Sequence, residues 1–180
     1  ALVYTATDTP KTIVDNAPAG VTTNITVGGI GRIKRVVMQT NITHGFDADV
    51  DATLTSSGNV VTDVSSDNGG SGANFTDTIF HTACPPSVTA GTAPFNGCFK
   101  PEAPFTSYNG GQAKGVWGWK VVDDAAGAAG TINSWRLALC VTQTTTLTIT
   151  PVNSAPVINS VAPTTATEAA MNSASWTRSW

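Results

Sequence analysis

Five aspartates in two short segments are the residues of this chain best suited to bind a metal ion. Asp47, Asp49 and Asp51 form one segment and Asp123 and Asp124 the other, and together they are five of the twelve acids. On a strand, Asp49 and Asp51 share one face, where like charges repel unless they share a cation. Loop carboxylates are typical calcium ligands. We therefore predict a Ca²⁺ site if the two segments meet, with solvated loop acids or turn caps as the alternative.

Catalytic groups are scarce. His44 and His81 are the only histidines, and a hydrolytic triad needs a histidine beside a nucleophile and a carboxylate. Neither lies in a nucleophile motif such as Gly-x-Ser-x-Gly, so we interpret both as structural or loop residues. Paired carboxylates for glycoside hydrolysis are harder to exclude, because the aspartates cluster. We predict that the chain lacks a catalytic triad and is not itself an enzyme.

Tryptophans and cysteines are expected to be structural. Alternation places Trp117 and Trp119 on one strand face and Trp135 on the inner face of another strand, which favours a core over a sugar-binding platform. Cys84 and Cys98 flank a loop rich in Pro, Gly, Ser and Thr. We expect a disulfide between them, which would stabilise the fold by about 3 kcal/mol. Cys140 is expected to be a small buried hydrophobe.

The elements that position these residues are short strands. Period-2 alternation and β-branched residues predict them at 21–27, 30–42, 49–55, 60–64, 116–122, 132–141 and 144–150. Long Gly-rich connections favour a sandwich over a parallel α/β fold. We predict an all-β jelly-roll sandwich of about eight strands with an extended C-terminal tail.

Composition restricts the partners and the compartment. The 180 residues carry a net charge of -3, and only 12% of them are charged. A nucleic acid or an anionic membrane would require a basic field, so neither is expected as a partner. There is no apolar run long enough to span a membrane. Ala1 begins without a signal segment, as in a mature exported protein, and we predict a secreted, extracellular or cell-surface location.

Composition also changes after Cys140. From Val141 to Trp180 the only charged residues are Glu168 and Arg178. We predict a jelly-roll domain at 1–141, followed at 142–180 by a linker or strand extension rich in Thr, Pro and Ala, leading toward an immunoglobulin-like repeat.

An ordered series of motifs identifies a family. DTPKTIVDN, NITHGFDADVDATLTSSGNV and NGGSGANFTDTIF resemble in order the P domain, or Homo B domain, of kexin-like and furin-like proprotein convertases and bacterial secreted subtilisin-like proteases. The resemblance covers about residues 5 to 140. The positions that match the family pattern are His44, Phe46, Asp49, Val50, Leu54, Gly58, Pro101, Pro104, Asp123, Gly130 and Trp135.

The resemblance implies a jelly roll without catalytic residues that packs on a protease and supports its stability and its calcium or pH response. Several positions depart from the pattern: Ala48 replaces a glycine, Ala73 an aspartate, and His81 and Thr82 the acids that follow Phe80. Some calcium ligands of the family are therefore expected to be absent.

We consider three alternative functions for this chain. The first is a calcium-binding accessory domain attached to a secreted subtilisin-like serine protease. The second is a module of a cell-surface or filament-forming protein, whose partners would be neighbouring copies or domains bound through the uncharged strand at 144–150. The third is a carbohydrate-binding jelly roll.

Overall fold

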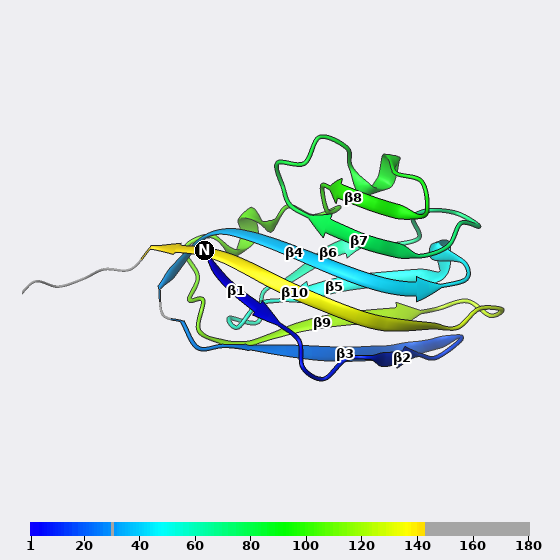
Figure 1. The fold of residues 1–180 in the computed structure, drawn as a ribbon, viewed down its shortest axis with the longest axis horizontal. Helices are drawn as coiled ribbons and strands as arrows, with labels where there is room; N and C mark the ends of the chain where they lie inside the picture. The colour runs from blue at the N-terminus through cyan, green and yellow to red at the C-terminus, as the bar shows by residue number, and fades with distance from the viewer. Residues whose placement is uncertain (30, 143–180) are drawn as a thin grey trace, which may run out of the picture. The chain divides into compact units, whose positions relative to one another are not determined.

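The computed structural model describes residues 1–29 and 31–142, which lie in the first of two compact units of the chain. They form two β-sheets packed face to face (Figure 1). The six-stranded sheet contains β1 (Leu2–Thr5), β2 (Lys11–Ile13), β4 (Arg32–His44), β7 (Phe75–Phe80), β8 (Phe95–Phe99) and β10 (Gly130–Thr142). The four-stranded sheet contains β3 (Ala17–Val27), β5 (Val50–Thr55), β6 (Val61–Ser65) and β9 (Gly115–Asp123).

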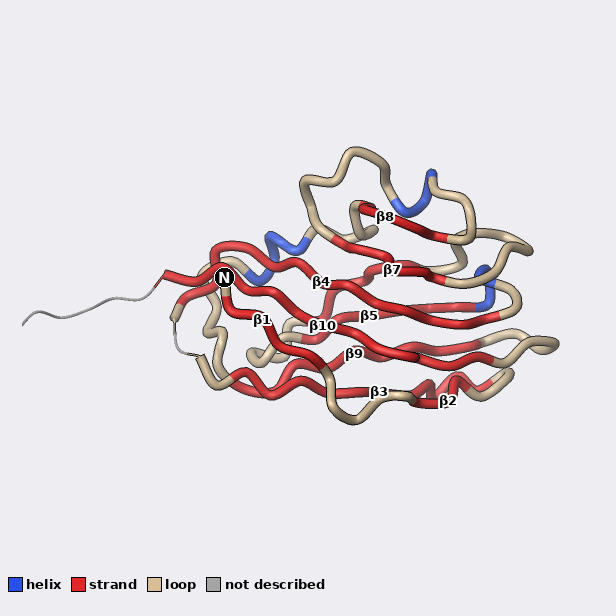
Figure 2. The backbone as a smooth tube through the Cα atoms, in the orientation of Figure 1, coloured by secondary structure: helices blue, strands red, loops and turns tan. Residues whose placement is uncertain are grey.

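Short 3₁₀ turns lie in the connections (Figure 2), at η1 (Asp47–Asp49), η2 (Val88–Ala90) and η3 (Phe105–Tyr108). The larger sheet has the order β1-β10-β4-β7-β8, with β2 also paired to β10, and the smaller has the order β3-β9-β5-β6. Pairing is antiparallel except between β7 and β8. The long β4–β10 ladder starts with His44 opposite Gly130, so the N-terminal end of β10 lies beside the C-terminal end of β4.

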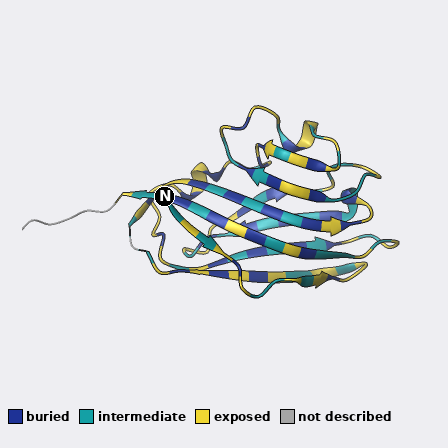
Figure 3. Cartoon of the chain, in the orientation of Figure 1, coloured by how far each residue is buried: buried dark blue, intermediate teal, exposed yellow. Residues whose placement is uncertain are grey.

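Aromatic side chains fill the space between the sheets. Trp117, Trp119 and Trp135 are at most 1% exposed, and the alternation of buried and accessible positions along β4 and β10 is visible in Figure 3. The indole Nε1 of Trp117 donates to the Ala113 carbonyl, and that of Trp135 donates to Thr23 Oγ1. Two of the three indole N–H groups are therefore satisfied within the core, as burial of a polar group requires. The prediction that these tryptophans are core residues is confirmed.

The predicted all-β sandwich is also confirmed, although the described residues contain ten strands instead of about eight. The sequence pattern missed β1, β2, β7 and β8. β1 and β2 are only four and three residues long, too short to show a periodic pattern. β8 contains a glycine and an asparagine, residues depleted in strands. The predicted strand at 144–150, the rest of the tail at 143–180 and the proposed domain boundary lie outside the described residues.

The cysteines follow the prediction in part. Cys84 and Cys98 form the expected disulfide. The prediction for Cys140 was wrong: its thiol is free and half-buried, because Leu139 points into the core and the next residue along a strand points outward. No helix among the described residues is long and apolar enough to cross a membrane.

Candidate functional site

The two acidic segments lie side by side at one end of the sandwich. β5 pairs with β9, which places Val50 opposite Asp123. Beyond this pair, the amide of Asp124 donates to the Asp49 carbonyl at 3.2 Å. Backbone pairing therefore brings all five predicted ligands to the same region, but their side chains divide into a buried group and an outer group.

The centre of the buried group is a contact between the sheets. His44 of β4 and Asp123 of β9 both have side chains with 0% exposure, and His44 Nε2 donates to Asp123 Oδ2 at 3.0 Å. The other ring nitrogen, Nδ1, lies 2.9 Å from the Phe46 carbonyl oxygen. Both imidazole nitrogens are therefore engaged within the fold, and the ring is buried away from solvent.

Asp123 also organises the surrounding backbone. Its Oδ1 accepts hydrogen bonds from the amides of Asn16 and Ala125, each at 3.3 Å. Gly130 allows the neighbouring strand to approach, because a Cβ at this position would lie 2.5 Å from His44 Cδ2. The carboxylate thus holds two connecting loops as well as the imidazole.

Asp47 is buried on the same side of the molecule but lacks a full set of partners. Its Oδ1 accepts from the Asn74 amide at 2.9 Å, and Asn74 Oδ1 in turn accepts from the His44 amide at 3.1 Å. Oδ2 is buried without a hydrogen-bond partner. Burial raises the pKa of Asp47 to about 6, although the Asn74 amide and the nearby His44 oppose the shift. We call His44, Asp47, Asn74 and Asp123 the buried polar cluster.

The outer group is a concentration of negative charge. The pKa of the exposed Asp67 is raised. The largest cause is slight desolvation, and the smaller causes are the negative charges of Asp51, Asp124, Glu102 and Asp49. Asp51 accepts a hydrogen bond from Ser66 Oγ. We call Asp49, Asp51, Asp67 and Asp124 the outer acidic cluster. Within residues 1–29 and 31–142, no group of three or more His, Cys, Asp or Glu side chains is arranged as a preformed metal site.

Sequence reasoning missed several of these residues. Asp67 was missed because it follows β6, away from both acidic segments in sequence. In the Gly-rich stretch after it, the carbonyls of Gly72 and Gly70 accept hydrogen bonds from the amides of Asp47 and Ala48. Asn74 has a φ of 76°, a region that asparagine tolerates better than most residues. In the sequence, the only sign of this role is that Asn74 directly precedes the strand β7.

The contact between the sheets gives a first testable prediction. Asp123→Ala leaves His44 buried and unpaired and frees two backbone amides, so the free energy of unfolding should fall by about 3 kcal/mol or more. Asp123→Asn, which keeps an acceptor oxygen, should cost less. Urea unfolding in EDTA measures the change. The neighbouring exposed Asp124→Ala is the control and should stay within about 0.5 kcal/mol of the parent chain; equal losses at the two positions would contradict the role of Asp123.

A second prediction concerns pH. Because the pKa of Asp47 is about 6 in the folded chain and 3.8 in the unfolded chain, the folded chain binds more protons between these values. Stability should therefore fall as pH rises from about 4 to about 6, by about 2–3 kcal/mol for this group. Asp47→Asn should flatten this slope in metal-free urea titrations. An unchanged slope in the variant would show that other groups cause the dependence.

Comparisons with known proteins agree with the all-β fold. The family model described as the proprotein convertase P-domain matches residues 33–139. A search of curated proteins finds no match. Among solved structures, the serine protease of Aeromonas sobria in complex with a chaperone is similar at 14% identity and a TM-score of 0.53, covering 77% of this chain and 26% of that chain.

A second structure of the serine protease of Aeromonas sobria has 16% identity and a TM-score of 0.49, with the same coverage of both chains. The chain thus spans about a quarter of the length of the proteases that it matches. At these identities the structural likeness supports the fold alone, whereas the family model covers more than half of the sequence. The chain belongs to the proprotein convertase P-domain family.

Proposed function

We propose that this chain is the extracellular, non-catalytic accessory domain of a secreted subtilisin-like serine protease. The family match over residues 33–139 carries this proposal. The chain aligns with 26% of a serine protease, a share consistent with one domain beside a separate catalytic domain. The use of both His44 nitrogens within the fold also supports a stabilising role over a catalytic one.

Two other functions have less support. A filament module assembling through the strand at 144–150 depends on residues outside the described part of the chain, and it stays a prediction. Carbohydrate binding would need an accessible aromatic platform, whereas Trp117, Trp119 and Trp135 are buried. It also stays a prediction.

The accessory role predicts what the complete protein contains and how it behaves. Its reading frame should encode a subtilisin-like domain. Deletion of the segment equivalent to 1–142 should lower the yield of active, folded protease by about tenfold or more, because a domain that binds the folded enzyme shifts its folding equilibrium. Activity against a chromogenic peptide, normalised to total expressed protein, measures this yield.

Two variants sharpen that experiment. Asp123→Ala, which weakens this domain from within, should reduce the yield in the same direction as the deletion, and Thr26→Ser, at an exposed position of β3, should not. The isolated chain should not hydrolyse the peptide. A complete reading frame without a protease domain, or a deletion that leaves the yield of active protease unchanged, would contradict the proposal.

We further propose that the accessory domain binds Ca²⁺ at the outer acidic cluster. Ion pairs among the described side chains join only Lys11 to Asp8 and His44 to Asp123, so the outer carboxylates repel one another without a neutralising cation. Calcium suits such a group because it accepts six to eight oxygens in flexible geometry. The side chains are not arranged as a ready-made site, and rotation of Asp49, Asp67 and Asp124 would be needed to close around the ion.

The calcium proposal predicts a metal-dependent melting temperature. At ten times the dissociation constant, Ca²⁺ should stabilise the chain by about 1.4 kcal/mol, which raises Tm by about 3–5 °C. Asp49→Ala and Asp67→Ala should each remove the response, as measured by differential scanning calorimetry with CaCl₂ or EDTA. Asp8→Asn and Asp47→Asn are the controls and should retain it. Identical curves in CaCl₂ and EDTA for the parent chain would defeat the proposal.

A further inference from the structure

Two adjacent cationic side chains of β4, Lys34 and Arg35, are both exposed, although successive residues of a regular strand face opposite sides. The cause is an irregularity in the ladder with β10. Arg35 lies opposite Cys140. The next residue of β10, Val141, lies opposite Ile33, which leaves Lys34 as the extra residue of a β-bulge. The bulge therefore turns two neighbouring cations toward solvent.

Both side chains line a hollow of about 320 Å³ where three segments meet. The connection after β7 contributes His81 and Ala83, and η3 contributes the buried ring of Phe105. No aspartate or glutamate is among the described residues that line it. The volume is at the lower end of the range for ligand sites, about 300–1,000 Å³, which suits a ligand of the size of one amino acid.

Contacts between the three segments hold the walls of this hollow in place. The Phe105 amide donates to Thr82 Oγ1 at 3.1 Å, which joins η3 to the connection after β7. The amide of Gly110, just beyond η3, donates to the Ile33 carbonyl at 2.8 Å, which joins η3 to β4. The disulfide of Cys84 further ties down the connection. A hollow that exists before the ligand arrives lowers the entropy cost of binding.

The two cations of the hollow lack an acidic partner. Neither Lys34 nor Arg35 belongs to an ion pair among the described residues. Arg35 Nη2 donates to Cys140 Sγ at 3.2 Å, which anchors one side of the guanidinium. Since this group carries five N–H donors, most of them remain for a ligand.

His81 adds a hydrogen-bond donor. Burial, followed by the positive charge of Arg35, lowers the pKa of His81, so the ring is mostly neutral at pH 7. Its Nδ1 accepts from the Ala83 amide at 3.3 Å, which leaves the proton of the neutral ring on Nε2. The hollow thus combines two cations and an N–H donor with an apolar wall.

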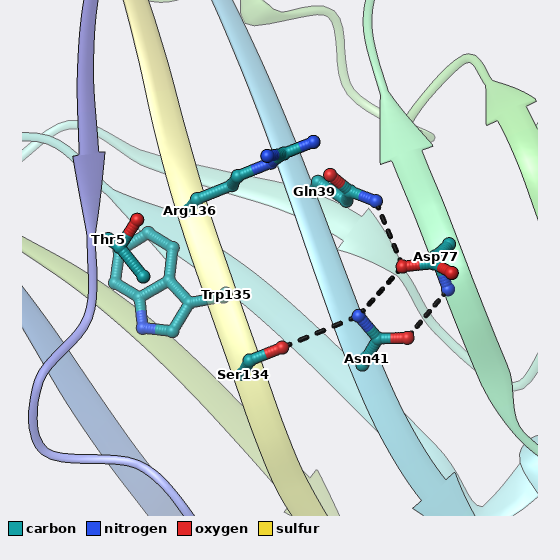
Figure 4. Close-up of a pocket in the computed structure, with 7 residues that line it drawn as sticks. All are labelled: Thr5, Gln39, Asn41, Asp77, Ser134, Trp135 and Arg136. Atoms are coloured by element: carbon teal, nitrogen blue, oxygen red, sulfur yellow. Dashed lines mark hydrogen bonds between the residues drawn. The ribbon is translucent and has the colours of Figure 1, made fainter.

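A second hollow, bounded by β4, β7 and β10, has a different character (Figure 4). It contains a carboxylate of the chain itself, Asp77, whose Oδ1 accepts from Gln39 Nε2 and Asn41 Nδ2, each at 3.1 Å. Arg136 of β10 lines this hollow and is also exposed. Arg136 is therefore a matched arginine on the same sheet whose surroundings are not purely cationic.

We infer that the hollow between β4, η3 and the connection after β7 binds an organic carboxylate whose neighbouring group is apolar. The planar guanidinium of Arg35 matches the geometry of a carboxylate and can hold both of its oxygens, and Lys34 adds a second positive charge. Val36 and Phe105 belong to the apolar wall, which the apolar group of the ligand covers and removes from water. The site does not depend on the accessory role proposed above.

N-acetylphenylalanine is the probe, titrated at pH 7 into the ¹⁵N-labelled chain and followed by NMR. Amide signals of residues 81–83 and 105–109 should shift and saturate with a dissociation constant of about 1 mM. The neutral amide of the same compound should bind about tenfold more weakly or less, because it loses the charged hydrogen bonds to Arg35. Sulfate, which has no apolar group, should also bind about tenfold more weakly or less.

Variants test the named residues. Arg35→Gln should weaken the binding of N-acetylphenylalanine about tenfold. Ala83→Glu should weaken it at least as much, because it places a carboxylate of the chain beside Arg35. Ala83→Gln and Arg136→Gln are the controls and should retain the affinity of the parent chain. Thermal melting shows that each variant is folded. Equal affinities for acid and amide, equal affinities for acid and sulfate, or an unchanged affinity in Arg35→Gln would overturn the inference.

A last comparison identifies the source of the carboxylate. The C-terminus of a peptide that ends in phenylalanine has the required chemistry, and so does a small aromatic acid. A tetrapeptide with this C-terminus that binds more tightly than N-acetylphenylalanine would support the site and identify a peptide end as its ligand. Equal affinities of the two would support the site with a small organic acid as its ligand.

Discussion

The end of this sandwich depends on one buried hydrogen bond between its sheets. His44 ends β4 in one sheet and Asp123 ends β9 in the other, and their side chains meet at 3.0 Å without access to solvent. Two charged or polar groups are tolerated in such a place only when their hydrogen bonds are nearly complete. Asn16, Ala125 and Phe46 complete them from three loops. The contact therefore sets the positions of these loops as well as of the sheets.

Asn74 and Gly130 show how exacting this arrangement is for the backbone. Asn74 uses its side chain and its amide to join the amide of His44 to the carboxylate of Asp47, and it takes a left-handed φ to do so. Gly130 lies where any side chain would collide with the His44 ring. These small or turn-forming residues carry no chemistry of their own. They are required because the polar groups around them have a single satisfied geometry.

Sequence reasoning recovered the core better than the site. Alternation was sufficient to assign Trp117, Trp119 and Trp135 to the interior, because strand parity fixes the face of each side chain. The same parity was overlooked for Cys140, one residue after the inward Leu139. The calcium prediction depended on the two acidic segments meeting, and the pairing of β5 with β9 brings them together. The separation of Asp47 and Asp123 from Asp49, Asp51 and Asp124 was not predicted, because it depends on η1, a turn that leaves no periodic signal, and on a long-range contact with His44.

The turn η1 places Asp47 and Asp49, two positions apart, in different electrostatic environments. Asp47 faces the interior, where burial raises its pKa, while the charge of Asp49 contributes to the raised pKa of the exposed Asp67. A cation at the outer acidic cluster would make the electrostatic potential at nearby carboxylates more positive and would therefore lower the pKa of Asp47. Protonation of Asp47 and charge at the surface are thus linked through one short segment, which in turn is hydrogen-bonded to the Gly-rich loop. With Ca²⁺ bound at the outer acidic cluster as proposed, this coupling would tie the metal to the protonation of Asp47.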